Sequence, residues 1–312
     1  MSGFTFKTAK RVGTTTLIGL AGGTGSGKTY SALRLATGLA DGREFGVIDT
    51  EAGRALHYAD EFNFQHGDLG PPFTPDRYRE AIVAAEAAGF PVVVVDSMSH
   101  EHAGDGGILD MHEAEWARLG HKESTKFLAW VKPKGQHKRM VSRLLQLRCH
   151  LILCFRAEPK IKLVKRGGKT EVVNAGWQPV VAKGLDFEMT ASWMLEHEKP
   201  GMAAAPIKLP KQFESIFPKD QLIDERAGEK LAAWASGEVA KQSDAGSADD
   251  GDPRSIAQRI REEFVEPGVL SRDKAGRVLR GAGLGKKDDL EAAEWSHIRT
   301  LLGIAANGAK KQ

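Results

Sequence analysis

Cysteine is scarce in this chain, and long apolar runs are absent. Only two cysteines, Cys149 and Cys154, occur among 312 residues, and they form no CxxC pair. This excludes a disulfide-stapled mini-protein and offers no recognisable structural zinc site. No stretch of about 18 apolar residues occurs, which excludes a transmembrane helix, and residues 1–23 are too polar for a signal peptide. We therefore expect a cytoplasmic protein with buried thiols and no membrane contact.

A large excess of charge of either sign is also lacking. Lys and Arg total 44 against 41 for Asp and Glu, a net charge of +3, which neither favours nor excludes a nucleic-acid partner because the distribution of charge decides. Residues 236–253 hold five acidic side chains, a single lysine and no large apolar group. This composition predicts an acidic flexible linker. It separates a core, residues 1–235, from a C-terminal segment, residues 254–312.

The C-terminal segment has helical periodicity. Ile256, Ile260 and Phe264 follow one another at four-residue spacing, and further apolar residues recur up to Ile304. About fifty residues are enough for a small helical domain of marginal stability. It contains no motif that carries chemistry, so we expect a module that binds a protein partner or tethers the core.

In the core, apolar β-like runs alternate with helical patterns. The expected strands are residues 16–21, 45–50, 90–97, 150–156 and 185–195, and the expected helices are residues 29–39, 77–88 and 126–147. Four successive valines, residues 92–95, imply burial on both faces of a sheet. The alternation predicts an α/β fold with a mostly parallel sheet.

The strongest motif is glycine-rich. It fits GxxxxGK[ST] and lies between an apolar run and a helix; it consists of Gly22, Gly23, Thr24, Gly25, Ser26, Gly27, Lys28 and Thr29, followed by Tyr30. Such a loop brings backbone N–H groups around phosphate oxygens, and the helix that follows points its positive end at them. Lys28 is expected to reach the β and γ phosphates, and Thr29 to bind Mg²⁺. The sequence therefore predicts a P-loop that binds ATP and Mg²⁺, with Tyr30 beside the nucleotide.

Two carboxylates are expected near the phosphates. Asp96 ends the valine run, at the carboxyl end of a buried strand, where open α/β sheets bind ligands. It is the expected second Mg²⁺ ligand, the Walker B acid. Glu51 follows the second strand and lies on the same face as Asp49. Glu51 is expected to act as general base or to orient the attacking water; the alternative is a capping role at a helix start near Ala52.

The order of these parts resembles the RecA-fold ATPases. The matching segments are GGTGSGKT (22–29), VIDTEAGRALHYA (47–59) and VVVVDS (92–97). The chain is also similar to bacteriophage RecA-like ATPases related to single-strand annealing and recombination proteins, through residues 97–112, 130–146, 149–160 and 185–198. The resemblance covers roughly residues 14–235. It implies a RecA-like core, catalysis by Glu51, metal binding by Asp96, a homo-oligomer as ring or filament, and a host cytoplasm.

A basic segment follows the fourth expected strand. Its cations are Lys160, Lys162, Lys165, Arg166 and Lys169. Alternating residues on either side of Gly167 and Gly168 predict a β-hairpin. In RecA-like proteins the loop after this strand binds DNA, so the resemblance implies contact with single-stranded DNA through phosphates. The alternative is a solvated hairpin whose lysines serve solubility.

A second basic run, residues 132–143, lines the same path or forms a solvated helix face. Neither run contains an aromatic residue for base stacking.

Two further cations are candidates for contact with the γ-phosphate. Arg156 ends its strand and is expected to sense the phosphate in cis, whereas the resemblance implies that Lys183 acts in trans on a neighbouring copy.

The main hypothesis is an Mg²⁺-dependent ATPase that couples ATP binding or hydrolysis to single-stranded DNA binding, annealing or strand exchange. The alternatives are a P-loop small-molecule phosphotransferase and an ATP-gated assembly or loader protein.

Overall fold

The computed structural model describes residues 6, 8, 9, 11, 13–166, 169–237, 256–269, 271–281, 298 and 302. Internal contacts divide the chain into two compact units, Met1–Val239 and Ala240–Gln312. The expected linker, residues 236–253, lies outside the described residues except for Ser236 and Gly237. Each unit is described by itself.

The first unit is built on an eight-stranded sheet with the order β3-β2-β4-β5-β1-β7-β8, and β6 pairs with β5. The strands are β1 (Leu17–Gly22), β2 (Phe45–Asp49), β3 (Phe64–Asp68), β4 (Val92–Asp96), β5 (His150–Arg166), β6 (Lys169–Pro179), β7 (Ala191–Leu195) and β8 (Ala205–Lys208). All neighbours from β3 to β7 are parallel, whereas β8 and β6 are antiparallel to β7 and β5. This confirms the predicted α/β fold with a mostly parallel sheet.

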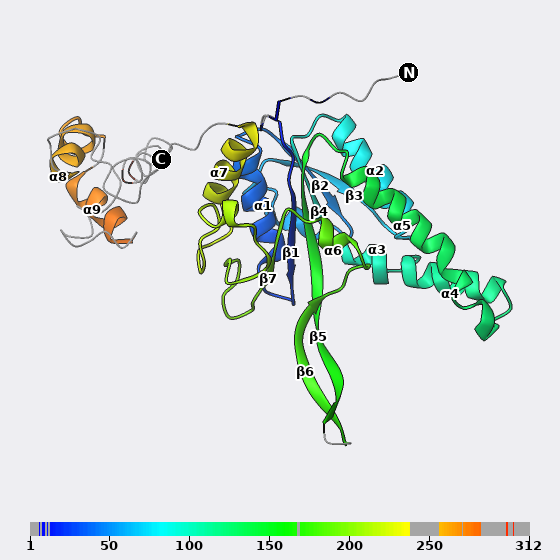
Figure 1. Cartoon of the computed structure of the whole chain (residues 1–312). Coiled ribbons are helices and arrows are strands. Elements are labelled where there is room, and N and C mark those ends of the chain that lie inside the picture. The colour runs from blue at the N-terminus through cyan, green and yellow to red at the C-terminus, as the bar shows by residue number, and fades with distance from the viewer. Residues whose placement is uncertain are drawn as a thin grey trace. The chain divides into compact units, whose positions relative to one another are not determined.

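Helices cover both faces of this sheet (Figure 1). They are α1 (Lys28–Leu39), α2 (Pro75–Ala87), α3 (Ser99–Ala103), α4 (Ile108–Arg118), α5 (Val131–Leu144), α6 (Leu185–Glu188) and α7 (Glu225–Ser236). Alternate valines of β4 enter two separate cores: Val92 and Val94 pack in the core that contains α1 and α7, and Val93 and Val95 in the core that contains α2 and α5. Burial on both faces explains why this strand is an uninterrupted run of valine.

Helices α1 and α7 approach each other through two glycines. A methyl group at Gly38 would lie 1.8 Å from the carbonyl oxygen of Glu225, and one at Gly228 would lie 2.4 Å from that of Leu35. Arg34 of α1 also donates hydrogen bonds to both carboxylate oxygens of Glu225, at 2.9 and 2.5 Å. The C-terminal helix of the unit therefore holds the helix that follows the glycine-rich loop.

Two expected elements differ from the structure. Residues 185–195 do not form one strand: α6 comes first, because Leu185 and Met189 are buried at helical four-residue spacing, and β7 begins only at Ala191. The helix expected over residues 126–147 is shorter, since α5 begins at Val131 and places Pro133 in its first turn, the position a helix tolerates. A short 3₁₀ turn, η3 (Leu128–Trp130), precedes it.

The described part of the second unit is helical. It comprises α8 (Ile256–Ile260), a π-helical turn η5 (Arg261–Val265) and α9 (Arg272–Gly281). A small apolar cluster joins them; its buried members are Ile260, Phe264, Ala275, Leu279, Ile298 and Leu302. Across the described residues of both units, no helix has the length and apolar character that crossing a membrane requires.

Candidate nucleotide site

The carboxyl ends of four parallel strands meet at one edge of the sheet. In register, Gly22 of β1 lies opposite Arg156 of β5, and Asp49 of β2 lies opposite Asp96 of β4. A cavity of about 590 Å³ opens there. Its lining residues are Gly22, Gly23, Thr24, Gly25, Gly27, Lys28, Thr29, Tyr30, Glu51, Arg54, Tyr58, Asp96, Arg156 and Ala157. The fold thus brings most residues of the predicted site into one cavity, although they lie far apart in the sequence.

The glycine-rich loop bends through two left-handed residues. Gly25 and Gly27 have φ of 77° and 84°, a region that disfavours any side chain, and Gly27 directly precedes α1. The Lys28 ammonium donates a hydrogen bond to the carbonyl oxygen of Gly23 at 2.8 Å, and the Ser26 hydroxyl donates to the same oxygen at 2.9 Å. Lys28 is therefore folded back over the loop, where a bound phosphate would lie within its reach.

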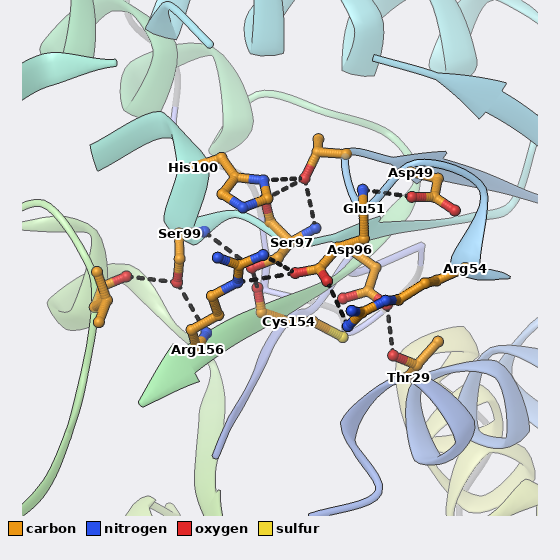
Figure 2. Close-up of polar contacts among 12 residues, drawn as sticks. Thr29, Asp49, Glu51, Arg54, Asp96, Ser97, Ser99, His100, Cys154 and Arg156 are labelled. Carbon is orange, nitrogen blue, oxygen red and sulfur yellow. Dashed lines mark hydrogen bonds and ion pairs between the residues drawn. The ribbon is translucent and has the colours of Figure 1, made fainter. Parts of the chain in front are cut away.

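Thr29 and Asp96 join the loop to the end of β4. The hydroxyl of Thr29 donates to a carboxylate oxygen of Asp96 at 2.5 Å (Figure 2). Asp96 is buried, and this burial raises the pKa of its carboxyl above the ordinary value, although the hydrogen bond from Thr29 acts in the opposite direction. Two side-chain oxygens, of Thr29 and Asp96, thus lie side by side next to the glycine-rich loop.

Glu51 lies between two arginines. One carboxylate oxygen accepts hydrogen bonds from Nε and Nη2 of Arg156, at 2.9 and 2.8 Å, and the other accepts from Nη1 of Arg54 at 3.0 Å (Figure 2). The sequence analysis placed Glu51 and Arg156 near the γ-phosphate, but it did not foresee their contact or the part of Arg54. The signal available in the sequence was a cation and an aromatic residue shortly after Glu51: Arg54 follows it by three residues and Tyr58 by seven.

Asp49 has a different task from Glu51. It is fully buried, and its two oxygens accept hydrogen bonds from the backbone N–H groups of Glu51, at 2.6 Å, and Ala55, at 2.9 Å. It therefore fixes the turn after β2. The helix near Ala52 is the 3₁₀ turn η1 (Arg54–Tyr58), and the backbone N–H of its second residue, Ala55, is bonded by Asp49 and not by Glu51. Glu51 does not cap this turn; its side chain lines the cavity, where the two arginines hold it.

Comparison with known families bears on this site. A family model described as an AAA domain, AAA_24, matches residues 15–190, more than half of the chain. The chain belongs to this AAA domain family. It is accordingly a nucleotide-binding P-loop ATPase, as the glycine-rich motif predicts. No protein among the curated ones matches the chain.

The AAA domain provides the chemistry that a magnesium nucleotide needs. The glycine-rich loop would hold the phosphates with its backbone N–H groups. Side chains at Gly25 and Gly27 would be strained, and one at Gly27 would also lie 2.9 Å from the backbone nitrogen of Gly201. The Thr29 hydroxyl and the Asp96 carboxylate are the hard oxygen ligands that Mg²⁺ prefers. The residues present therefore fit both ATP and Mg²⁺.

An aromatic cluster borders the cavity of the AAA domain. The Tyr30 ring lies 5.5 Å from the rings of both Tyr58 and Phe62, measured between centroids. Tyr30 and Tyr58 line the cavity itself. The sequence analysis expected Tyr30 beside the nucleotide and missed Tyr58, the last residue of η1. The rings of Tyr58 and Phe62 are tilted at 53° and 73° to that of Tyr30, and the cluster gives the cavity an aromatic border.

A long β arm extends from the AAA domain at the nucleotide site. The first half of β5 belongs to the central sheet, and from Ala157 onward it pairs with β6 as an antiparallel ribbon (Figure 1). This confirms the strand pairing of the predicted hairpin, whereas its turn at Gly167 and Gly168 lies outside the described residues. Lys160 is exposed on the arm; the side chains of Lys162, Lys165, Arg166 and Lys169 lie outside the described residues.

Lys183 lies apart from the cavity. It is exposed in the turn that precedes α6, and it is not one of the residues that line the cavity of its own chain. The structure thus groups Lys28, Thr29, Glu51, Asp96 and Arg156 and leaves Lys183 outside this group. The catalytic and binding roles of all these residues remain predictions.

Proposed function

We propose that the protein is an Mg²⁺-dependent ATPase with a RecA-like core, which couples ATP binding and hydrolysis to single-stranded DNA binding, annealing or strand exchange in phage recombination. One observation carries this proposal. The strand that brings Arg156 to the nucleotide cavity continues, without interruption, into the exposed arm that holds the most basic run of the sequence. A polyanion bound to the arm would therefore be connected to the nucleotide site through a single strand, β5.

The proposed roles follow from the contacts in the cavity. Lys28 would bind the β and γ phosphates, and Thr29 and Asp96 would hold Mg²⁺, which when bound offsets phosphate charge. Glu51 would orient the attacking water and accept its proton. In the structure, Arg156 and Arg54 engage both oxygens of Glu51. A γ-phosphate would compete for these guanidinium groups and release Glu51 toward the water.

We infer that the protein works as a homo-oligomer. Lys183 is exposed and does not line the nucleotide cavity of its own chain, so it would contact the nucleotide of a neighbouring copy. A basic group supplied in trans stabilises the charge that develops on the transferring phosphate. The second unit would bind a protein partner or tether the assembly.

ATP turnover in the presence and absence of single-stranded DNA tests this function. Wild-type protein should hydrolyse ATP with stimulation by DNA, and DNA binding should weaken steeply as salt rises, since cations on the arm displace counterions. Lys28→Ala should abolish turnover, whereas Lys122→Ala, a lysine outside the cavity, should not. ATP turnover without stimulation by DNA and without salt-sensitive DNA binding would contradict the recombination function and leave the ATPase standing. Phosphate transfer to a nucleoside instead of water would indicate a phosphotransferase.

A further inference from the structure

The arm exposes apolar side chains that a soluble protein normally buries. Ile161, Val172 and Trp177 are 69%, 65% and 53% exposed. They stand on a ribbon of only two strands, outside both apolar cores of the first unit. Grouped exposed apolar residues of this kind mark a binding surface more often than an idle one.

The strand register places these three residues on one face of the arm. Trp177 lies opposite Pro159, and Ile161 lies opposite Asn174. Between these two pairs β5 moves on by two residues and β6 by three. The extra residue of β6 forms a bulge, which Gly176, with φ of 77°, accommodates. Directly opposed residues, and residues two apart on a strand, share a face. Trp177 and Ile161 are therefore on the same side, and so is Val172, two residues from Asn174.

Trp177 also touches the phosphate loop. A methyl group at Gly23 would lie 3.2 Å from two carbon atoms of the Trp177 ring, so the ring rests directly on this glycine. The carbonyl of Gly23 is the one that accepts hydrogen bonds from Lys28 and Ser26. A movement of the loop when phosphates bind would thus shift the Trp177 ring, and a ligand stacked on the ring would press on the loop.

The charge of the arm indicates which ligand fits this face. Five of its residues in the sequence, 160, 162, 165, 166 and 169, are Lys or Arg, against two acids, Glu158 and Glu171. An aromatic ring among cations is the combination that binds single-stranded nucleic acid, whose bases stack and whose phosphates are negative. The basic run itself contains no aromatic residue, but the returning strand supplies Trp177 at the base of the arm.

We propose that an unpaired base of single-stranded DNA stacks on Trp177, on the face that Trp177 shares with Ile161 and Val172, and that this contact links DNA occupancy to the phosphate loop. The inference rests on the proposed function and deepens it, because it names the surface that DNA occupies and the residue that connects this surface to the nucleotide site.

Binding of labelled oligo-thymidine to the full chain tests the inference, by fluorescence anisotropy at low salt. Trp177→Ala should weaken binding about 5- to 100-fold, the loss expected for one stacked base, whereas Trp177→Phe retains a ring and should bind nearly as wild type. Phe127→Ala removes an even more exposed ring, 88% exposed and outside the arm, and should leave binding unchanged. Thermal melting of each variant shows that it is folded.

Tryptophan emission gives a second measurement. Oligo-thymidine and, separately, ATP should change the emission of wild-type protein, and Trp177→Phe should lose both changes while it still binds DNA. If wild type binds DNA and Trp177→Ala binds it equally well, the stacking inference is wrong and the DNA function stands. If wild type does not bind DNA, the proposed function fails, and the inference with it. Trp177-dependent binding to anionic lipid vesicles without any effect on oligo-thymidine would overturn the inference in favour of a membrane surface.

Discussion

Arg156 and Glu51 meet across an intervening strand. Arg156 ends the sheet portion of β5, Glu51 follows β2, and β4 lies between those two strands. The Arg156 guanidinium nevertheless donates two hydrogen bonds, at 2.9 and 2.8 Å, to the same oxygen of Glu51. The group that would sense the phosphate therefore holds the group that would activate water, so each controls the availability of the other.

This pairing predicts coupled losses of activity. Glu51→Gln should still bind ATP but lower kcat about 10²- to 10⁴-fold, the usual contribution of a general base. Arg156→Ala should lower kcat about 10²-fold or more, because the phosphate loses a cation. Steady-state turnover together with ATP binding measures both effects. Arg54→Ala, at an exposed side chain that contacts the other oxygen of Glu51, should have a smaller effect. The double variant Glu51→Gln with Arg156→Ala should have a kcat little lower than that of Glu51→Gln alone. Strictly multiplicative losses of kcat would show that Glu51 and Arg156 act separately.

The contact between Thr29 and Asp96 predicts a specific need for magnesium. Asp96→Asn and Thr29→Val should each raise the Mg²⁺ concentration for half-maximal turnover, about 10- to 100-fold, because one oxygen ligand or its orienting partner is lost. Thr29→Ser retains the hydroxyl and should behave as wild type. Titration of Mg²⁺ at saturating ATP gives the measurement. An unchanged Mg²⁺ requirement in both Asp96→Asn and Thr29→Val would refute the assignment of these residues as metal ligands.

Gly27 and Gly42 form a matched pair of left-handed glycines. Their φ angles are 84° and 72°, but a methyl group at Gly27 would lie 2.9 Å from the Gly201 backbone nitrogen, whereas one at Gly42 would meet nothing within 4 Å. Gly42→Ala should reduce the free energy of unfolding by about 1–2 kcal/mol, the cost of the left-handed backbone alone. Gly27→Ala should reduce it further and weaken ATP binding. Urea denaturation measures both, and equal losses would show that the crowding at Gly27 has no effect.

His150 predicts that stability falls in mild acid. Its Nδ1 accepts a hydrogen bond from the backbone N–H of Thr16 at 3.2 Å, and burial together with Arg43 lowers its pKa to about 4. Between pH 6.5 and about 4 the unfolded chain binds a proton that the folded chain does not, so the free energy of unfolding decreases as pH falls through this range. The loss is at most about 3.5 kcal/mol, at about 1.4 kcal/mol per pH unit.

Urea denaturation at a series of pH values checks this expectation. His150→Asn provides the control, because the Asn oxygen can accept the same hydrogen bond but does not titrate. Its stability should depend less steeply on pH over the same interval. Identical pH profiles for the variant and the wild type would mean that His150 does not titrate as proposed.

Much of the fold was predictable because its buried strands are strongly apolar. The valine run of β4 and the glycine-rich loop identify themselves by composition. β3 was missed because it is an edge strand: its sequence, FQHGD, is mostly polar, and all five of its residues are half-buried or exposed. α6 was taken for strand because Leu185 and Met189 are apolar in either conformation, and only burial at four-residue spacing distinguishes the two.

The site was predictable where one segment carries the chemistry, and not where tertiary contacts create it. Lys28, Thr29 and Asp96 follow from local motifs. The contact of Arg54 with Glu51 depends on the 3₁₀ turn after β2, and the place of Tyr58 on the cavity border depends on the same turn. Trp177 depends on a bulge in β6, because three regularly alternating residues from Asn174 to Trp177 would turn its ring to the opposite face of the arm.

The family match ends at residue 190, one residue before β7 begins. β7 pairs with β1 along its length, from Ile18 opposite Ala191 to Gly22 opposite Leu195, and α7 covers α1. A fragment cut at that limit would bare the strand that leads into the phosphate loop and an apolar helix surface beside it, which invites aggregation. The region that the family model matches is thus shorter than the region expected to fold on its own, and the shortest fragment expected to fold and bind nucleotide extends through α7 to Ser236.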